Sequence, residues 1–230
     1  MIKGKVKTVL ETDNPDEVLI QYEDKVTAGN GRKVDFPEGK GEVCCKISQL
    51  LFEELERYGI RTHYISMPTP TSMCCKKVDI IPIEVVVRNI ATGSIVRQTT
   101  IEEGTEFDPP LVEYFLKDDA KDDPLLTYDR VRLMGIDPQP MKEGALLINT
   151  ILSKIFREIG LTLVDFKLEF GYDSNKNLLL ADELSPDGMR LWKDGESFDK
   201  DLFRKDKGDI SSAYKYILEQ LKTAIETHSQ

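Results

Sequence analysis

Charged and apolar residues alternate along residues 163–170 of the chain. Every second position is charged, and the positions between them are apolar. The charged positions are Asp165, Lys167 and Glu169. A repeat of two predicts a β-strand with one charged and one apolar face. Residues 171–177 are typical of a turn, and a second apolar run begins at Leu178, so the sequence predicts a β-hairpin.

This hairpin would bring two carboxylates together. A turn centred on the 175–176 peptide bond would place Glu169 directly opposite Asp182. Mg²⁺ prefers oxygen ligands and is often held by one or two carboxylates together with phosphate oxygens. A solvated strand face would carry the same charges, and a slip of one residue would separate the two carboxylates. A polar turn follows at residues 185–190 and favours a functional site beyond the strand end. Its charged residues include Asp187 and Arg190.

Three segments have the apolar spacing of amphipathic helices: residues 41–58, 141–159 and 211–227. Gly59 and Gly160 favour helix ends after the first two. The expected core positions are Ile47, Leu50, Leu51 and Leu55 in the first helix, Leu147, Ile151, Ile155 and Phe156 in the second, and Tyr214, Ile217, Leu218, Leu221 and Ile225 in the third.

Near the start of the chain, residues 4–10 and 18–22 read as two strands joined by a proline-containing turn. Glycine allows the backbone to approach a phosphate closely, and Gly4 lies at this strand's start. Lys5 and Lys7 alternate and would point to the same side. Lysines at a sheet edge are commonly solubilising, so this pattern alone leaves both interpretations open.

The β-branched run at residues 80–89 predicts a central strand with Pro82 near its start. Glu84 and Arg88 share one face of this strand. Charges on a buried strand require partners or a function, and we favour a function here.

Two further stretches are predicted as loops. Residues 24–31 are polar and contain glycine, and residues 102–124 are dense in acidic residues and proline. A long charged loop is usually disordered, and in an enzyme it can instead form a lid.

The composition limits the function classes. A chain of 230 residues can bury a substantial core as one large domain or two lobes. The net charge of −10 argues against general affinity for nucleic acid. No apolar run reaches membrane-spanning length, and the first residues lack the apolar region of a signal peptide. We therefore expect a cytoplasmic protein.

The cysteines form two adjacent pairs, Cys44-Cys45 and Cys74-Cys75, and the histidines are His63 and His228. Neither pair has the spacing of a zinc site, so a metal site built on sulfur and nitrogen is not expected. Reduced, buried thiols are the better interpretation, and His63 is expected to be structural.

Several motifs together resemble one family, the phosphoribosylaminoimidazole-succinocarboxamide synthases (SAICAR synthetases). The resemblance covers nearly the whole chain in the same order. The motifs are Gly4-Lys5-x-Lys7, residues 82–89 (PIEVVVRN) with Gly93-Ser94, residues 163–171 (LVDFKLEFG), and Asp182-Glu183-x-Ser185-Pro186-Asp187-Gly188-x-Arg190-Leu191-Trp192. One departure is Cys44-Cys45, where the family pattern suggests asparagine.

The resemblance implies an α+β fold of two lobes. Residues 1–80 would form an N-terminal, mainly antiparallel β lobe like a kinase small lobe, and residues 81–230 a larger α+β lobe, with ATP in the cleft. It also implies a reaction in which ATP, a carboxyaminoimidazole ribonucleotide (CAIR) and L-aspartate become SAICAR, ADP and phosphate, with Mg²⁺ as cofactor. A homodimer is the implied assembly.

The resemblance also implies roles for individual residues. The ATP site would comprise Gly4, Lys5, Lys7, Lys76 and Ile80. Mg²⁺ would be bound by Glu169 and Asp182. The ribonucleotide would be bound by Glu84, Arg88, Ser94 and Arg190. The reacting end would be lined by Lys117, Asp165, Lys167 and Asp187.

Two other functions are compatible with the same residues. A small-molecule kinase on a related scaffold would stop after phosphoryl transfer. A nucleotide-binding module would have no turnover, and the combined sets of lysines, carboxylates and arginines argue against it.

Overall fold

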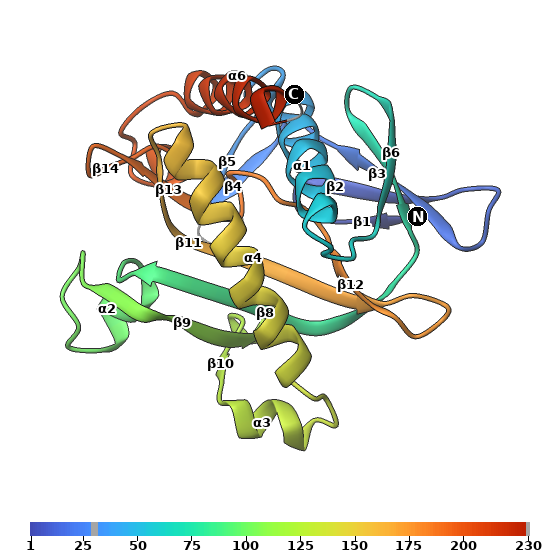
Figure 1. Ribbon diagram of the computed structural model, residues 1–230, viewed down its shortest axis with the longest axis horizontal. Helices are drawn as coiled ribbons and strands as arrows, with labels where there is room; N and C mark the ends of the chain where they lie inside the picture. The colour runs from blue at the N-terminus through green and yellow to red at the C-terminus, as the bar shows by residue number, and fades with distance from the viewer. Residues whose placement is uncertain (29–31, 229–230) are drawn as a thin grey trace.

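The computed structural model describes residues 1–28 and 32–228 and has an α+β fold built on two main antiparallel sheets (Figure 1). The first sheet contains strands from the N-terminal third of the chain in the order β1-β2-β3-β7-β6. Its strands are β1 (Ile2–Lys3), β2 (Lys7–Glu11), β3 (Glu17–Tyr22), β6 (Tyr64–Thr69) and β7 (Ser72–Lys76). The predicted pairing of residues 4–10 with 18–22 is confirmed by the β2–β3 hairpin, in which Lys7 lies opposite Tyr22.

The second sheet has the order β10-β9-β8-β11-β13-β14, with β12 paired to β11. Its strands are β8 (Asp79–Ile90), β9 (Glu106–Leu116), β10 (Leu125–Leu126), β11 (Thr162–Tyr172), β12 (Leu178–Ala181), β13 (Met189–Lys193) and β14 (Glu196–Ser197). The strand predicted as central, β8, and the strand predicted from the alternation, β11, are direct neighbours, so their charged positions lie side by side.

Three long helices cover the sheets: α1 (Lys40–Arg57), α4 (Gln139–Glu158) and α6 (Ile210–His228). Helix α4 lies across the second sheet, and α1 packs between the first sheet and α6 (Figure 1). The remaining elements are short: β4 (Val26–Ala28), β5 (Lys33–Asp35), α2 (Ser94–Gln98), the 3₁₀ turn η1 (Asp119–Lys121), α3 (Tyr128–Leu133) and α5 (Asp201–Arg204).

All three helix predictions are confirmed within one or two residues. Gly59 and Gly160 follow α1 and α4 with φ of 82° and 74°, a left-handed conformation that glycine adopts without steric cost. One core position is wrong, because Leu147 is 50% exposed. The buried stripe of α4 runs through Met141, Ala145 and Ile148, and Leu147 lies beside it.

Two loop predictions need correction. Nearly half of the expected loop at residues 102–124 is β9, which pairs with β8 from Ile83↔Leu116 to Arg88↔Leu111. Residues 102–105 form a turn before this strand, and the connection after Leu116 contains the short turn η1. In the 24–31 stretch, β4 occupies Val26–Ala28, and residues 29–31 lie outside the described part of the chain.

The two sheets separate between Lys76 and Asp79, close to the predicted lobe boundary at residue 80. Helix α6 from the end of the chain nevertheless packs on α1, and buried residues from both sheets belong to one core cluster. The division into residues 1–80 and 81–230 therefore stays a prediction. Within the described residues, none of the helices combines the length and apolar character needed to span a membrane.

Candidate active site

Two adjoining cavities lie where the first sheet meets the second. The arginine cavity, of about 400 Å³, is lined by Arg88, Arg190, Arg204, Ser94 and Asp165 among others. The lysine cavity, of about 580 Å³, is lined by Gly4, Lys5, Lys7, Lys117, Glu169 and Asp182 among others. Eight residues line both cavities: Lys5, Thr27, Glu84, Asp123, Lys167, Asp187, Gly188 and Lys200. The two cavities therefore form one continuous site with a shared wall.

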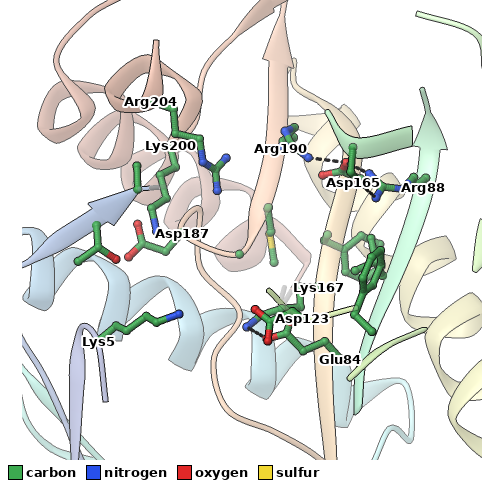
Figure 2. Close-up of a pocket in the computed structure, with 18 residues that line it drawn as sticks. Lys5, Glu84, Arg88, Asp123, Asp165, Lys167, Asp187, Arg190, Lys200 and Arg204 are labelled. Carbon is green, nitrogen blue, oxygen red and sulfur yellow. Dashed lines mark hydrogen bonds and ion pairs between the residues drawn. The ribbon is translucent and has the colours of Figure 1, made fainter. Parts of the chain in front are cut away.

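The arginine cavity is organised by strand register. Asp165 on β11 pairs with Arg88 on β8 and with Arg190 on β13. Oδ2 of Asp165 accepts hydrogen bonds from Nη1 of Arg88 at 2.9 Å and from Nη1 of Arg190 at 2.8 Å (Figure 2). The Asp165 side chain is 6% exposed, so this shared carboxylate is shielded from solvent. The structure thus makes Asp165 a partner of the two arginines; its place at the reacting end, implied by the resemblance, stays a prediction.

The Arg88 guanidinium is fixed on every side. Its Nε donates to Glu113 on β9 at 2.6 Å, and its Nη2 donates to the Ser94 hydroxyl at 2.8 Å. Ser94 begins α2, and Gly93 precedes it with φ of 69°. A Cβ on Gly93 would lie 2.8 Å from Nη2 of Arg190, so both conformation and space require glycine there. The result is a rigid pair of guanidinium groups with forked donor geometry, which suits a phosphate.

The lysine cavity pairs each of its main lysines with carboxylates. Nζ of Lys7 lies 2.6 Å from Oδ1 of Asp182 and 2.9 Å from Oε1 of Glu183. Burial disfavours the charged amine of Lys7, but these two carboxylates outweigh burial and raise its pKa. Burial likewise disfavours the charged form of Asp182, yet Lys7 and Lys167 hold the pKa of that carboxyl well below its usual range. Both partners are therefore ionised at neutral pH.

Lys167 and Lys117 share the Glu169 carboxylate from opposite oxygens. Lys167 on β11 lies 2.8 Å from Glu84 and 3.1 Å from Oε1 of Glu169, whereas Lys117 pairs with Oε2. Glu84 and Glu169 pair directly across β8 and β11, so the register brings these charges together. Lys117 follows β9 directly, and its backbone N–H donates to the Pro82 carbonyl at 3.1 Å, which anchors it at the cavity.

The predicted metal ligands share the lysine cavity, but not through the predicted register. Glu169 pairs with Ala181, and Asp182 is the next residue, in a left-handed conformation with φ of 64°. The register prediction is therefore wrong by one residue. Its reason lies in the turn, where the Asp173 carboxylate accepts the backbone N–H groups of Asn175 and Asn177. This centres the turn on Asn175.

The donor set of Glu169 and Asp182 fits Mg²⁺, because both supply hard carboxylate oxygens in a cavity large enough for phosphate. Among the described residues, no group of three or more histidine, cysteine or acidic side chains forms a closed metal cage. A Mg²⁺ ion here would take its remaining ligands from phosphate and water, as Mg²⁺ commonly does.

Asp187 lies on the wall shared by the two cavities, and residues of two helices bind its carboxylate. Tyr214 of α6 donates a hydrogen bond of 2.9 Å to its Oδ1, and Lys40 at the start of α1 pairs with its Oδ2. Tyr214 is fully buried, and Lys40 also donates to the Lys25 carbonyl at 2.9 Å. Asp187 is thereby fixed against the α1–α6 pair.

The comparisons with known proteins agree on one family. The SAICAR synthetase family model matches residues 1–221. The chain belongs to the SAICAR synthetase family. It is 46% identical to phosphoribosylaminoimidazole-succinocarboxamide synthase of Nostoc punctiforme, with 99% of this chain and 97% of that protein covered. It is 47% identical to the enzyme of the same name from Methanocaldococcus jannaschii, with 96% and 93% covered. A solved SAICAR synthetase in complex with ADP superposes with a TM-score of 0.93 at 39% identity, covering 96% of each chain.

Most of the residues inferred from the SAICAR synthetase motifs line the two cavities, and two do not. Lys76 at the end of β7 is exposed, and Ile80 at the start of β8 is 41% exposed; neither lines either cavity. Their place beside adenine stays a prediction. Arg190 lies within β13, so it is part of a strand and not of the turn predicted at residues 185–190.

The sequence patterns did not point to several residues that line the two cavities or contact their lining. Lys40 and Tyr214 belong to helices whose apolar stripes signalled only core packing. Glu113 was hidden in the stretch predicted as a loop. Lys200 and Arg204 belong to a charged segment without periodicity, so no pattern distinguished them from surface residues.

Proposed function

We propose that this chain is an ATP-dependent ligase that joins the amine of L-aspartate to the carboxylate of CAIR, giving SAICAR, ADP and phosphate in purine biosynthesis. The observation that carries the proposal is the pair of adjoining cavities, one with two fixed arginines and one with lysines beside carboxylates. Two phosphate-bearing substrates can bind there with their reacting groups at the shared wall. Membership of the SAICAR synthetase family supports the same reaction.

The chemistry explains why the site contains this set of side chains. A carboxylate is a poor acylating agent, so one of its oxygens first attacks the γ-phosphorus of ATP, and ADP leaves. The aspartate amine then attacks the acyl carbon, and phosphate leaves with that oxygen. Phosphoryl transfer depends on alignment and charge neutralisation more than on a protein nucleophile. The site accordingly relies on lysine, arginine and carboxylate groups.

The arginine cavity is assigned to the ribonucleotide phosphate. Arg88 and Arg190 supply fixed donors, and Ser94 adds a hydroxyl beside them. Asp165 keeps the two guanidinium groups in register. A phosphate binding between them gains charge-assisted hydrogen bonds without ordering flexible side chains.

The lysine cavity is assigned to the ATP phosphates, with Gly4, Lys5 and Lys7 as their cradle. The Gly4 N–H donates to the Lys7 carbonyl at 2.8 Å, so this segment forms a tight turn at the cavity edge. The solved SAICAR synthetase that contains ADP supports nucleotide binding by this fold. Lys76 and Ile80 would border the adenine at the outer end.

Glu169 and Asp182 would hold Mg²⁺ together with the phosphates. When bound, Mg²⁺ would neutralise charge on the transferred phosphoryl group. In the structure, lysines provide the countercharges for these two carboxylates. Glu84, Lys117, Lys167 and Asp187 would surround the reacting carboxylate.

We further propose that the ligase acts in the cytoplasm as a homodimer. The four cysteines are free thiols, three of them buried, which suits a reducing compartment. Mass photometry at micromolar concentration would test the homodimer directly.

Omitting substrates one at a time tests the function. The ligase should release ADP in step with a new amide only when ATP, CAIR and L-aspartate are all present. The product mass should equal CAIR plus aspartate minus water, and succinate should give no amide because it lacks the amine. A kinase would release ADP with CAIR alone and accumulate a stable phosphorylated product, and a binding module would release none.

A further inference from the structure

Lys200 differs from the other lysines on the wall shared by the two cavities. Three lysines line both cavities: Lys5, Lys167 and Lys200. Lys5 pairs with Asp119, and Lys167 pairs with Glu84 and Glu169. In the part of the chain that the structure describes, the Lys200 amine makes no ion pair or hydrogen bond. It is half-buried at the start of α5.

The arginines of the site are also paired. Arg88 contacts Asp165 and Glu113, Arg190 contacts Asp165, and Arg204 contacts Asp201 at 2.5 Å. Among the described residues, Lys200 is therefore a half-buried cation of this site that makes no direct contact with an acidic side chain.

Both carboxylate oxygens of the acidic side chain near Lys200 already have other partners. The Lys200 side chain reaches toward Asp187 (Figure 2), whose two oxygens are bound by Tyr214 and Lys40. Burial opposes ionisation of Asp187, but Lys200 and Lys40 outweigh it and hold the pKa of that carboxyl below its usual range. Burial lowers the pKa of Lys200. An anion that bound the Lys200 amine would offset this cost of burial.

The substrates of the proposed reaction narrow the identity of that anion. The arginine cavity accounts for the ribonucleotide phosphate, and Lys5 and Lys7 account for the ATP phosphates. L-aspartate contributes two carboxylates for which no partner has been assigned. It must also reach the shared wall, because its amine attacks the acyl carbon there.

We propose that Lys200 binds a carboxylate of L-aspartate and so positions the amino acid for attack. This inference rests on the proposed ligase function. The contact is an ion pair in a partly buried cavity, where charge-assisted hydrogen bonds are stronger than at the surface.

Lys200→Gln tests the inference by removing the charge and retaining a polar side chain. A charge-assisted contact contributes about 1.5–3 kcal/mol, so the KM for L-aspartate should rise roughly 10- to 150-fold. The KM values for ATP and CAIR should change less than about threefold. The Kd of succinate, measured by calorimetry in the presence of ADP and CAIR, should rise in parallel. This binding readout does not require turnover.

Lys207→Gln is the matched control. Lys207 belongs to the same charged segment and lines neither of the two cavities, so the same loss of charge should leave all three KM values unchanged. Circular dichroism and the thermal midpoint establish that each variant is folded.

An unchanged KM for L-aspartate in folded Lys200→Gln, or a larger rise for CAIR or ATP, would overturn the assignment. If Lys200→Gln does not fold, Lys200→Arg decides, because it keeps the charge and should selectively weaken succinate and aspartate binding. Equal effects on all substrates, or none, would count against the proposal. A wild-type enzyme that made no amide would refute the ligase function itself, a separate outcome.

Discussion

Asp165 and Arg88 lie directly opposite each other on the antiparallel strands β11 and β8, with Oδ2 and Nη1 2.9 Å apart. The same carboxylate oxygen also accepts from Arg190 on β13. One buried anion thus sets the spacing of two arginines on neighbouring strands. Substrate affinity in the arginine cavity should therefore depend on a residue that is itself almost inaccessible.

Asp165→Asn should weaken CAIR binding and also destabilise the fold. The amide keeps the shape but removes the charge that aligns the two guanidinium groups, so the KM for CAIR should rise about 10- to 100-fold. Breaking a buried pair should also lower the free energy of unfolding by about 3–5 kcal/mol. Steady-state kinetics and urea unfolding measure the two effects. Glu219→Gln, at an exposed pair with Lys222, is the control and should change neither. A larger rise in the KM for ATP would show that the phosphate assignments are reversed.

Asp182→Asn should weaken Mg²⁺-dependent nucleotide binding. Loss of one anionic ligand should raise the Kd of ADP at least about tenfold with Mg²⁺ present. Binding without Mg²⁺ should change much less, because Lys7 keeps its second partner, Glu183. Calorimetry with and without Mg²⁺ makes this comparison. Equal Kd values for the variant and wild type with Mg²⁺ would remove Asp182 from the metal site.

Tyr214→Phe should release Asp187 on one side. The variant loses the 2.9 Å hydrogen bond to Oδ1 and leaves a buried carboxylate oxygen without that donor. We expect a loss of about 1–3 kcal/mol in the free energy of unfolding, together with reduced kcat. Tyr216→Phe on the same helix is the control, since Tyr216 packs against Phe198 and is only partly buried. If both variants lose the same stability, the Tyr214 hydroxyl has no special role.

His63 should make stability fall on mild acidification. It is 2% exposed, packs edge-on against Phe52, and its Nε2 has no hydrogen-bond partner among the described residues. Burial lowers the pKa of His63 from its ordinary 6.5 to about 4. The unfolded chain therefore binds a proton that the folded chain does not, and stability present above pH 6.5 is lost as the pH falls toward 4.

Between pH 7 and pH 5 this histidine should cost about 2 kcal/mol in the free energy of unfolding. His63→Gln should abolish most of that pH dependence, which urea unfolding at both pH values measures. His228 is present in both proteins, so its contribution cancels. An identical pH dependence of stability in the variant would contradict the claim that His63 is neutral in the folded protein.

The sequence predicted those parts of the site that follow from strand periodicity. Alternation located the charged face of β11 with Glu169, and the β-branched run located β8 with Glu84. That these two strands pair, and so bring Glu84 opposite Glu169, is seen only in the structure. The turn after β11 could not be derived in this way. Its centre depends on hydrogen bonds that the Asp173 carboxylate accepts from backbone N–H groups, and the resulting shift of one residue paired Glu169 with Ala181.

Contacts between segments far apart in the chain could not be predicted from the sequence patterns either. Strand β9 was concealed because Pro109 and Pro110 lie just before its regular pairing with β8, and the surrounding composition is acidic. Lys40 and Tyr214 meet Asp187 only because α1 and α6 pack together. Helical periodicity predicts which face is buried but not which polar group ends beside a cavity.

The transfer of one oxygen atom distinguishes a phosphorylated carboxylate from every route that bypasses it. CAIR labelled with ¹⁸O in both carboxylate oxygens should be converted with ATP and L-aspartate, and the released phosphate analysed by mass spectrometry. If the carboxylate is phosphorylated before amide formation, each phosphate carries one ¹⁸O and each SAICAR amide retains the other. Phosphate without ¹⁸O, formed alongside amide product, would contradict a phosphorylated carboxylate and the proposed roles of the residues at the shared wall.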